Sequence, residues 1–126
     1  SEESVSFAQK YNTKDLDKRC FIQQGDVCSL PYKEGAFDAV TAFETVYFWS
    51  PVNKALSEVA RVLRKGGCFL ISLEASDPEL GKMWTERIDG MVVYTPEDLE
   101  ERLSEAGFSS IRTIRKKGEI HIIARE

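Results

Sequence analysis

The sequence lacks the features that mark several protein classes. Its three cysteines are odd in number and form no CxxC pair, so we expect neither a disulfide framework nor a zinc site. No apolar run approaches the roughly 20 residues that a helix needs to cross a bilayer, and no signal-peptide pattern opens the chain. These absences favour a cytoplasmic protein with reduced thiols and no membrane partner.

An excess of positive charge is absent as well. The chain carries 17 Lys and Arg against 21 Asp and Glu, which gives a net charge of -4. A surface that binds nucleic acid needs clustered positive charge, and the one tight basic run, Arg115–Lys117, is short enough to be a solvated strand end. We therefore expect no nucleic-acid partner.

Histidine is nearly absent. The single histidine, His121, lies between two isoleucines near the end of the chain. No second metal ligand and no nucleophile accompanies it in the sequence, so a metal centre and a catalytic triad are both disfavoured. We expect no metal ion in this protein.

What the chain does contain is the composition of an ordinary globular domain. It is 42% hydrophobic and 30% charged over 126 residues, enough for one domain with a core of its own. Hydrophobic periodicity and turn residues predict eight main elements. They are a helix from Ser1 to about Asn12, strands at Cys20–Gln24 and Phe37–Phe43, a helix from Ser50-Pro51 to Gly66-Gly67, a strand at Cys68–Leu73, a helix from Thr95 to Gly107, and strands at Ser110–Arg115 and Glu119–Arg125. Pro78–Ile88 is a further candidate helix, ended by Gly90.

The order of these elements predicts the fold class. A strand-helix-strand unit favours a parallel sheet with right-handed crossovers, and the tight turn between the last two strands favours an antiparallel pair. Two helix starts carry capping signals, Ser50 before Pro51 and the capping box that begins at Thr95. We expect an α/β, Rossmann-like domain with a mostly parallel sheet, an antiparallel C-terminal strand pair and helices on both faces.

Five short motifs, in order, resemble one family. They are Gly25-Asp26-Val27, Leu30-Pro31-Tyr32, Phe37-Asp38-Ala39-Val40, Glu58 to Leu63 with Gly66-Gly67, and the closing Thr95 to Phe108 region. Together they resemble class I S-adenosylmethionine-dependent methyltransferases of the type 11-like group, in which the first four read GD, LPF, FDxV and ExxRVLKPGG. Here Tyr32 replaces Phe, and Arg64-Lys65 replaces Lys-Pro. The resemblance covers nearly the whole chain.

One departure from the family limits what the resemblance implies. The family's glycine-rich first loop, GxGxG, has no counterpart in this sequence, and neither has the acid that grips the ribose. The chain opens at Ser1 inside a predicted helix and resembles the segment that follows that acid. We therefore expect residues 1–126 to be the C-terminal two-thirds of a methyltransferase domain, a fragment that lacks the first strands of the fold.

The resemblance also implies a set of site residues. The Asp26 carboxylate would accept a hydrogen bond from the adenine amino group of S-adenosylmethionine, and the Val27 N–H would meet a ring nitrogen. Phe43 and Glu44 would lie beside the cofactor, although a plain core position is an equally common role for a residue such as Phe43. Three aromatic side chains would then lie where methyl acceptors approach, although packing is the more common role for aromatic residues before a helix. They are Tyr47, Phe48 and Trp49.

Other polar residues of these motifs have plain structural interpretations. Asp38 is expected to be structural, and Glu58 and Arg61, one helical turn apart, are expected to form a surface salt bridge worth a few tenths of a kcal/mol. Methyl transfer from a sulfonium needs mainly alignment and a dry site, so the resemblance implies no particular catalytic residue.

The resemblance implies methyl transfer to an unidentified, small-molecule acceptor in the parent protein, with weak or no activity in this chain alone. A non-enzymatic binding or assembly domain that keeps the methyltransferase-like core is the alternative, and a nicotinamide dehydrogenase ranks third. The strand Cys20–Gln24 would lose its neighbours in such a fragment. It is expected either to pair with Phe37–Phe43 or to leave an edge at which two chains form a homodimer.

Overall fold

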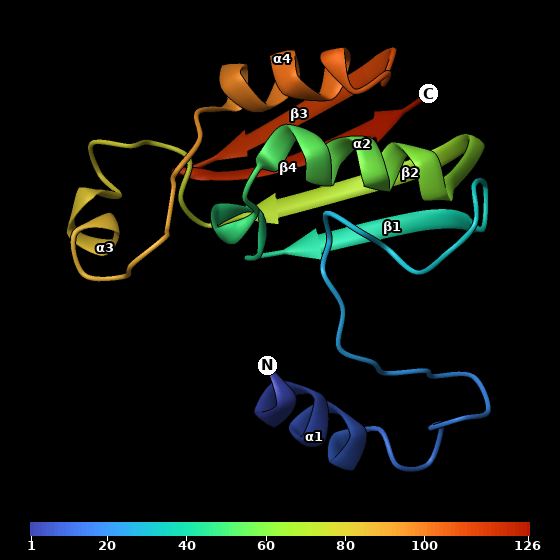
Figure 1. The fold of residues 1–126 in the computed structure, drawn as a ribbon. Coiled ribbons are helices and arrows are strands. Elements are labelled where there is room, and N and C mark those ends of the chain that lie inside the picture. The colour runs from blue at the N-terminus through green and yellow to red at the C-terminus, as the bar shows by residue number, and fades with distance from the viewer.

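The computed structural model describes all 126 residues. Its centre is a four-stranded sheet in the order β1-β2-β4-β3 (Figure 1). β1 (Phe37–Phe43) is parallel to β2 (Leu63–Leu73), whereas β4 (Glu119–Arg125) is antiparallel to both β2 and β3 (Ser110–Lys116). The Rossmann-like α/β class and the antiparallel C-terminal pair are confirmed. The sheet is mixed rather than mostly parallel, because β1 and β2 are the one parallel pair in this chain.

Two helices cover one face of this sheet. α2 (Val52–Val62) and α4 (Pro96–Glu105) lie on the same side in Figure 1. Beneath them, alternate strand residues are buried, among them Phe69, Ile71 and Ile122, as the two-residue period of a strand requires. The predicted helices on both faces are therefore found on one face, and the opposite face carries half-exposed Leu70 and Ile123.

The other helical elements are short or lie apart from the sheet. η1 (Val46–Phe48) is a 3-10 turn after β1, and α3 (Lys82–Thr85) is a single turn within the predicted Pro78–Ile88 helix. α1 (Glu2–Tyr11) begins after the N-cap Ser1, as predicted, but buries none of its residues. Figure 1 shows it joined to the sheet by a long extended segment.

The α2 boundaries differ from the prediction at both ends. The Ser50 side chain makes no capping hydrogen bond, and the N-cap is Pro51 in an extended conformation. The helix ends at Val62 rather than at the glycines, because Leu63 already pairs with Phe37 in the sheet. Gly66 has a left-handed conformation (φ +74°) and lies inside β2 rather than at the end of a helix.

The remaining predicted boundaries are close to those observed. Thr95 and Asp98 form the reciprocal capping box, Leu99 and Leu103 are buried, and α4 ends before Gly107. The tight turn between β3 and β4 places Lys116 opposite Glu119. Hydrophobic periodicity and capping residues determine these elements locally, which is why the sequence predicts them well.

The predicted strand Cys20–Gln24 is wrong. Cys20 makes one isolated bridge with Leu16, and the next five residues form no regular structure. A strand needs a neighbour to accept its hydrogen bonds, and β1 pairs with β2 alone. The expected pairing of Cys20–Gln24 with β1 is therefore also wrong in the single chain, while pairing between two chains stays a prediction.

Candidate functional site

The predicted adenine-binding residues lie in a tight turn. The backbone N–H of Ser29 donates to the Asp26 carbonyl (3.0 Å), and the N–H of Cys28 donates to Asp26 Oδ1 (2.8 Å). This Asx-type turn orients the exposed Asp26 carboxylate and leaves its second oxygen available to a ligand. Val27 packs against the edge of the core.

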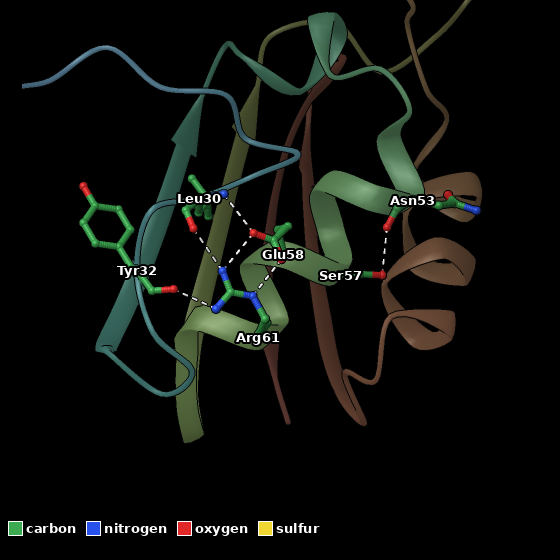
Figure 2. A network of polar contacts seen from close by, with 6 residues as sticks. All are labelled: Leu30, Tyr32, Asn53, Ser57, Glu58 and Arg61. Atoms are coloured by element: carbon green, nitrogen blue, oxygen red, sulfur yellow. Dashed lines mark hydrogen bonds and ion pairs between the residues drawn. The ribbon is translucent and has the colours of Figure 1, made fainter.

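A network of polar contacts ties the loop that follows this turn to α2 (Figure 2). Arg61 donates through Nη2 to the Leu30 carbonyl (3.1 Å) and through Nη1 to the Tyr32 carbonyl (2.7 Å). It also donates to both carboxylate oxygens of Glu58 at 2.7 and 2.9 Å. Glu58 in turn accepts a hydrogen bond from the Leu30 N–H (2.8 Å). The predicted salt bridge is confirmed, and it also binds the loop.

The same contacts shift the ionisation of the pair. The guanidinium of Arg61, followed by the Leu30 N–H, lowers the pKa of Glu58 to about 2. The hydrogen bond to Glu58 raises the pKa of Arg61 above its ordinary value. Both groups are charged across the physiological range, so the network persists at neutral pH.

A second network lies at the C-terminal end of β1. Glu44 has a left-handed backbone (φ +52°), which is uncommon for a residue with a side chain. Its Oε1 accepts from the Glu74 N–H (2.8 Å) and its Oε2 accepts from the Tyr47 hydroxyl (3.1 Å). The Tyr47 oxygen accepts from the Ala75 N–H (2.9 Å). These contacts join the end of β1 to the end of β2.

Burial makes Tyr47 a poor proton donor to solvent. Desolvation is the main cause that raises the pKa of Tyr47 to about 12, although the Ala75 N–H acts in the opposite direction. Nearby Glu44 adds to the increase. The phenol therefore stays neutral, and its hydroxyl donates one hydrogen bond to Glu44 and accepts one from the Ala75 N–H.

The three predicted acceptor-site aromatics have different surroundings. Tyr47 is buried, and Trp49 stacks on Phe69 with ring centroids 6.2 Å apart. Phe48 is 50% exposed. Packing thus accounts for Tyr47 and Trp49, and Phe48 alone presents a large open surface.

An open cavity beside β1 is lined by two of the predicted cofactor residues, Phe43 and Glu44, together with Ser72 and His121. Phe43 is 57% exposed, so it is not a core residue. The Ser72 hydroxyl and His121 Nδ1 are 2.9 Å apart and share a hydrogen bond. Asp26 and Val27 do not line this cavity, so the chain holds the four predicted cofactor residues in two separate groups.

The other residues singled out in the sequence have structural roles. Asp38 forms an ion pair with Arg64, and Arg115 forms one with Glu97. The three cysteines are free. No group of three or more His, Cys, Asp or Glu side chains is arranged to hold a metal ion, and no helix is long and apolar enough to cross a membrane.

Three contacts of the site could not be predicted from the sequence. They are the bonds of Arg61 to the carbonyls of Leu30 and Tyr32, and the Ser72–His121 bond. The partners are separated by 29 to 49 residues in the chain. The ExxR spacing brings Glu58 to Arg61, but no local pattern points to the loop.

The unit of β1, α2 and β2, with polar residues beyond the strand ends, is the layout of an α/β fold that binds a ligand at that edge of its sheet. The family described as "Methyltransferase domain" matches residues 1–71, more than half of the chain. The chain belongs to this family of methyltransferases.

Two curated relatives illustrate the match. The fatty-acid O-methyltransferase of Mycolicibacterium smegmatis is 47% identical over 71 residues, which are 56% of this chain and 24% of the relative. The uncharacterized methyltransferase YcgJ of Bacillus subtilis is 39% identical over 70 residues, 56% of this chain and 26% of the relative. The matched segments therefore span only about a quarter of the length of each of these two relatives.

Solved structures show the same fold. The crystal structure of YcgJ from Bacillus has a TM-score of 0.79 and 26% identity, with 91% of this chain and 52% of that chain covered. The structure of PigF with SAH has a TM-score of 0.78 and 20% identity, with 98% and 41% covered. At 20% identity the second likeness establishes the fold alone.

Proposed function

We propose that this protein takes part in methyl transfer from S-adenosylmethionine to a small-molecule acceptor, in the cytoplasm. The family match over residues 1–71 carries the proposal. The bound cofactor supplies an already activated methyl group. The protein then has mainly to align the acceptor and to exclude water, which agrees with a site that contains no buried acid-base pair.

The residues of the two groups suit the adenosyl end of this cofactor. Asp26 offers an exposed carboxylate whose orientation is fixed by the Cys28 N–H. A carboxylate accepts hydrogen bonds and the 6-amino group of adenine donates them, so the two groups can form a hydrogen bond. Phe43 and Glu44 would lie along the cofactor at the end of β1, where ligands bind in open α/β sheets. Phe48 is the aromatic residue best exposed to meet an acceptor.

We further propose that residues outside this chain hold the methionine end of the cofactor. A glycine-rich loop that could do so is missing from the sequence. In addition, β1 has no partner on its outer side, and one face of the sheet has no helix against it. A methyltransferase domain with further strands and helices would cover both.

Calorimetry with S-adenosylhomocysteine tests the cofactor proposal. We expect the 126-residue chain to bind weakly, with a dissociation constant near the millimolar range, and Asp26→Asn to weaken binding further, because an amide nitrogen can face the adenine amino group and cannot accept from it. Asp15→Asn, in an exposed turn, is the matched control and should leave binding unchanged. Micromolar binding by the unaltered chain would contradict the proposal that an essential loop lies outside it.

The open sheet favours a second candidate, a non-enzymatic assembly domain that keeps this core for contact with a partner. The two proposals differ in what a longer chain would do. If a protein that adds an upstream glycine-rich loop transfers methyl groups, the enzyme is supported. If the longer protein binds no cofactor at all, the assembly role is supported instead.

A further inference from the structure

We propose that Glu58 and Arg61 are positioning residues for the adenine end of the cofactor. They touch no ligand themselves and act through the loop from Asp26 to Gly35. This inference rests on the proposed function, because it takes Asp26 as the residue that meets adenine. It adds the residues on α2 that fix how the Asp26 carboxylate points.

α2 binds both polar groups of the Leu30 backbone. Glu58 accepts from the Leu30 N–H at 2.8 Å, and Arg61 donates to the Leu30 carbonyl at 3.1 Å. Both polar groups of one residue's backbone are thus bound by one charged pair on a helix. The Leu30 N–H and carbonyl point in different directions. Binding both of them therefore fixes the orientation of the Leu30 backbone as well as its distance from α2.

Arg61 also holds the loop at two more places. Its Nη1 donates to the Tyr32 carbonyl (2.7 Å), and its own backbone carbonyl accepts from the Gly35 N–H (2.9 Å). Figure 2 shows the guanidinium lying between Leu30 and Tyr32 on one side and Glu58 on the other. A planar guanidinium with a fixed fork of donors can satisfy such a set, whereas a lysine ammonium cannot do so in the same geometry.

The backbone between Leu30 and Asp26 connects the clamped loop to the carboxylate. The residue before Leu30 is Ser29, whose N–H donates to the Asp26 carbonyl (3.0 Å), and Cys28 between them is buried with its N–H on Asp26 Oδ1. Leu30 is therefore joined through Ser29 to the Asp26 carbonyl, and through Ser29 and Cys28 to the Asp26 carboxylate. On the other side of Asp26, residues 21–25 form no regular structure, and Gln23 donates to the Tyr32 hydroxyl (2.8 Å). The Cys28 thiol contacts the Ser50 and Pro51 carbonyls, so the turn is also tied to the start of α2.

The Glu58–Arg61 pair also differs from the ordinary ion pairs of this protein. The arginines that pair with Asp38 and Glu97 have side chains that are each 56% exposed. In the Glu58–Arg61 pair the exposed fractions are 34% for Arg61 and 19% for Glu58. An exposed pair contributes little, but a half-buried pair bonded to main chain controls the conformation of what it holds.

The consequence is a specific effect on base recognition. Adenine carries an amino group at position 6 and hypoxanthine a carbonyl, so a fixed carboxylate accepts from the first and repels the second. S-inosylhomocysteine is thus the matched probe for S-adenosylhomocysteine. If the loop loosens, the carboxylate can turn away, and the ratio of the two affinities falls even if both ligands still bind.

The experiment is an NMR titration of the 126-residue chain with each of the two ligands. The unaltered chain should prefer the adenosyl ligand by about tenfold or more, the scale of one hydrogen bond to a charged group. Arg61→Lys should bring the ratio toward one. Arg115→Lys changes an exposed pair remote from the loop and is the control that should keep the full preference. Glu58→Gln, which keeps an acceptor for the Leu30 N–H, should lower the ratio less than Arg61→Lys.

Each outcome has one meaning. A lower ratio in Arg61→Lys supports the inference, whereas a uniform loss of both affinities indicates general destabilisation and overturns it. An unchanged ratio in Arg61→Lys overturns the inference and leaves the proposed function intact. If the unaltered chain shows no preference for adenine, the assignment of Asp26 in the proposed function fails, and the inference fails with it. Should Arg61→Lys not fold by circular dichroism, the same ratio measured on Glu58→Gln decides.

Discussion

At the scale of single residues, charged side chains form hydrogen bonds with backbone groups of the loops at the site. Arg61 bonds two loop carbonyls and a carboxylate, and Glu44 bonds a backbone N–H and a phenol. No buried side-chain nitrogen or oxygen is left without a hydrogen-bond partner. A buried polar group without a partner would lower the stability of the folded chain. The loops at the site therefore adopt conformations in which their polar groups meet Arg61 and Glu44.

The lowered pKa of Glu58 predicts how stability depends on pH. Its folded-state pKa is about 2, below the ordinary value of 4.5, so the ionised group stabilises the folded chain above about pH 4.5. That contribution is lost as the pH falls toward 2. The melting temperature of Glu58→Gln should lie below that of the unaltered chain at neutral pH, and the gap should narrow on acidification.

Circular dichroism melts between about pH 7 and pH 3 measure this gap. Glu86→Gln removes an exposed carboxylate that forms no ion pair in the structure and should follow the unaltered chain at every pH. A gap for Glu58→Gln that stays constant over the range would show that its ionisation is not coupled to folding.

Residue spacing in the sequence predicts some of these side-chain contacts. The ExxR spacing predicts that Glu58 meets Arg61, whereas the strand predicted just before Asp26 does not form. Spacing within a helix says nothing about loops some thirty residues away, so the contacts with Leu30 and Tyr32 could be learned only from the folded chain. The same holds for Phe43, whose exposure depends on which elements lie over it.

At the scale of elements, the two main helices begin in different ways. α4 begins with a reciprocal capping box at Thr95, whereas α2 begins after an extended Pro51 without a side-chain cap. Instead, α2 is held by its buried face, to which Leu56 and Val59 belong. Tertiary packing can replace a cap, because most helix stability in proteins comes from the apolar face.

This difference gives a paired prediction. Thr95→Ala should lower the free energy of unfolding by about 1 kcal/mol, since it removes the acceptor for the Asp98 N–H. Ser50→Ala, the matched change before α2, should stay within about 0.5 kcal/mol of the unaltered chain, because Ser50 is exposed and caps nothing. Urea unfolding of the two variants measures both values. Equal losses would contradict the assignment of the cap.

The sequence predicts well those elements whose bounds are marked by local residues, such as capping residues, glycines and runs of apolar residues. β1 matches its predicted bounds, and α4 is marked by its box and Gly107. Cys20–Gln24 has the residues of a strand, yet a strand forms only where another supplies hydrogen bonds. Local propensity alone could not reveal that this chain provides no such neighbour.

At the scale of the whole molecule, the sheet has two unlike edges. β3, at one edge, carries Arg112, Arg115 and Lys116, and edge charges of this kind discourage pairing with another chain. β1, at the other edge, has Asp38 as its one charged residue. The unprotected edge is therefore the one at which further strands would add.

This asymmetry supports the proposal of a homodimer through β1. An antiparallel pair of β1 strands centred on Val40 would set Asp38 opposite Ala42, so that no like charges meet directly. Light scattering at high concentration should then give twice the chain mass of 14.3 kDa. Ala39→Lys should reduce the dimer by placing positive charge at the joined edges, whereas Ile114→Lys on the β3 edge should not. A strict monomer at all concentrations would rule the dimer out.

The uncovered face of the sheet has a practical consequence for handling the protein. Leu70 and Ile123 are half-exposed there, Phe43 at the end of β1 is exposed, and α1 leaves Phe7 and Tyr11 in contact with water. Dyes that fluoresce on apolar surfaces normally report unfolding, but they would already bind this chain in its native form. A thermal-shift experiment with such a dye would begin bright and give no clear transition, and a ligand or partner that covers the face would be seen as a fall in fluorescence at constant temperature.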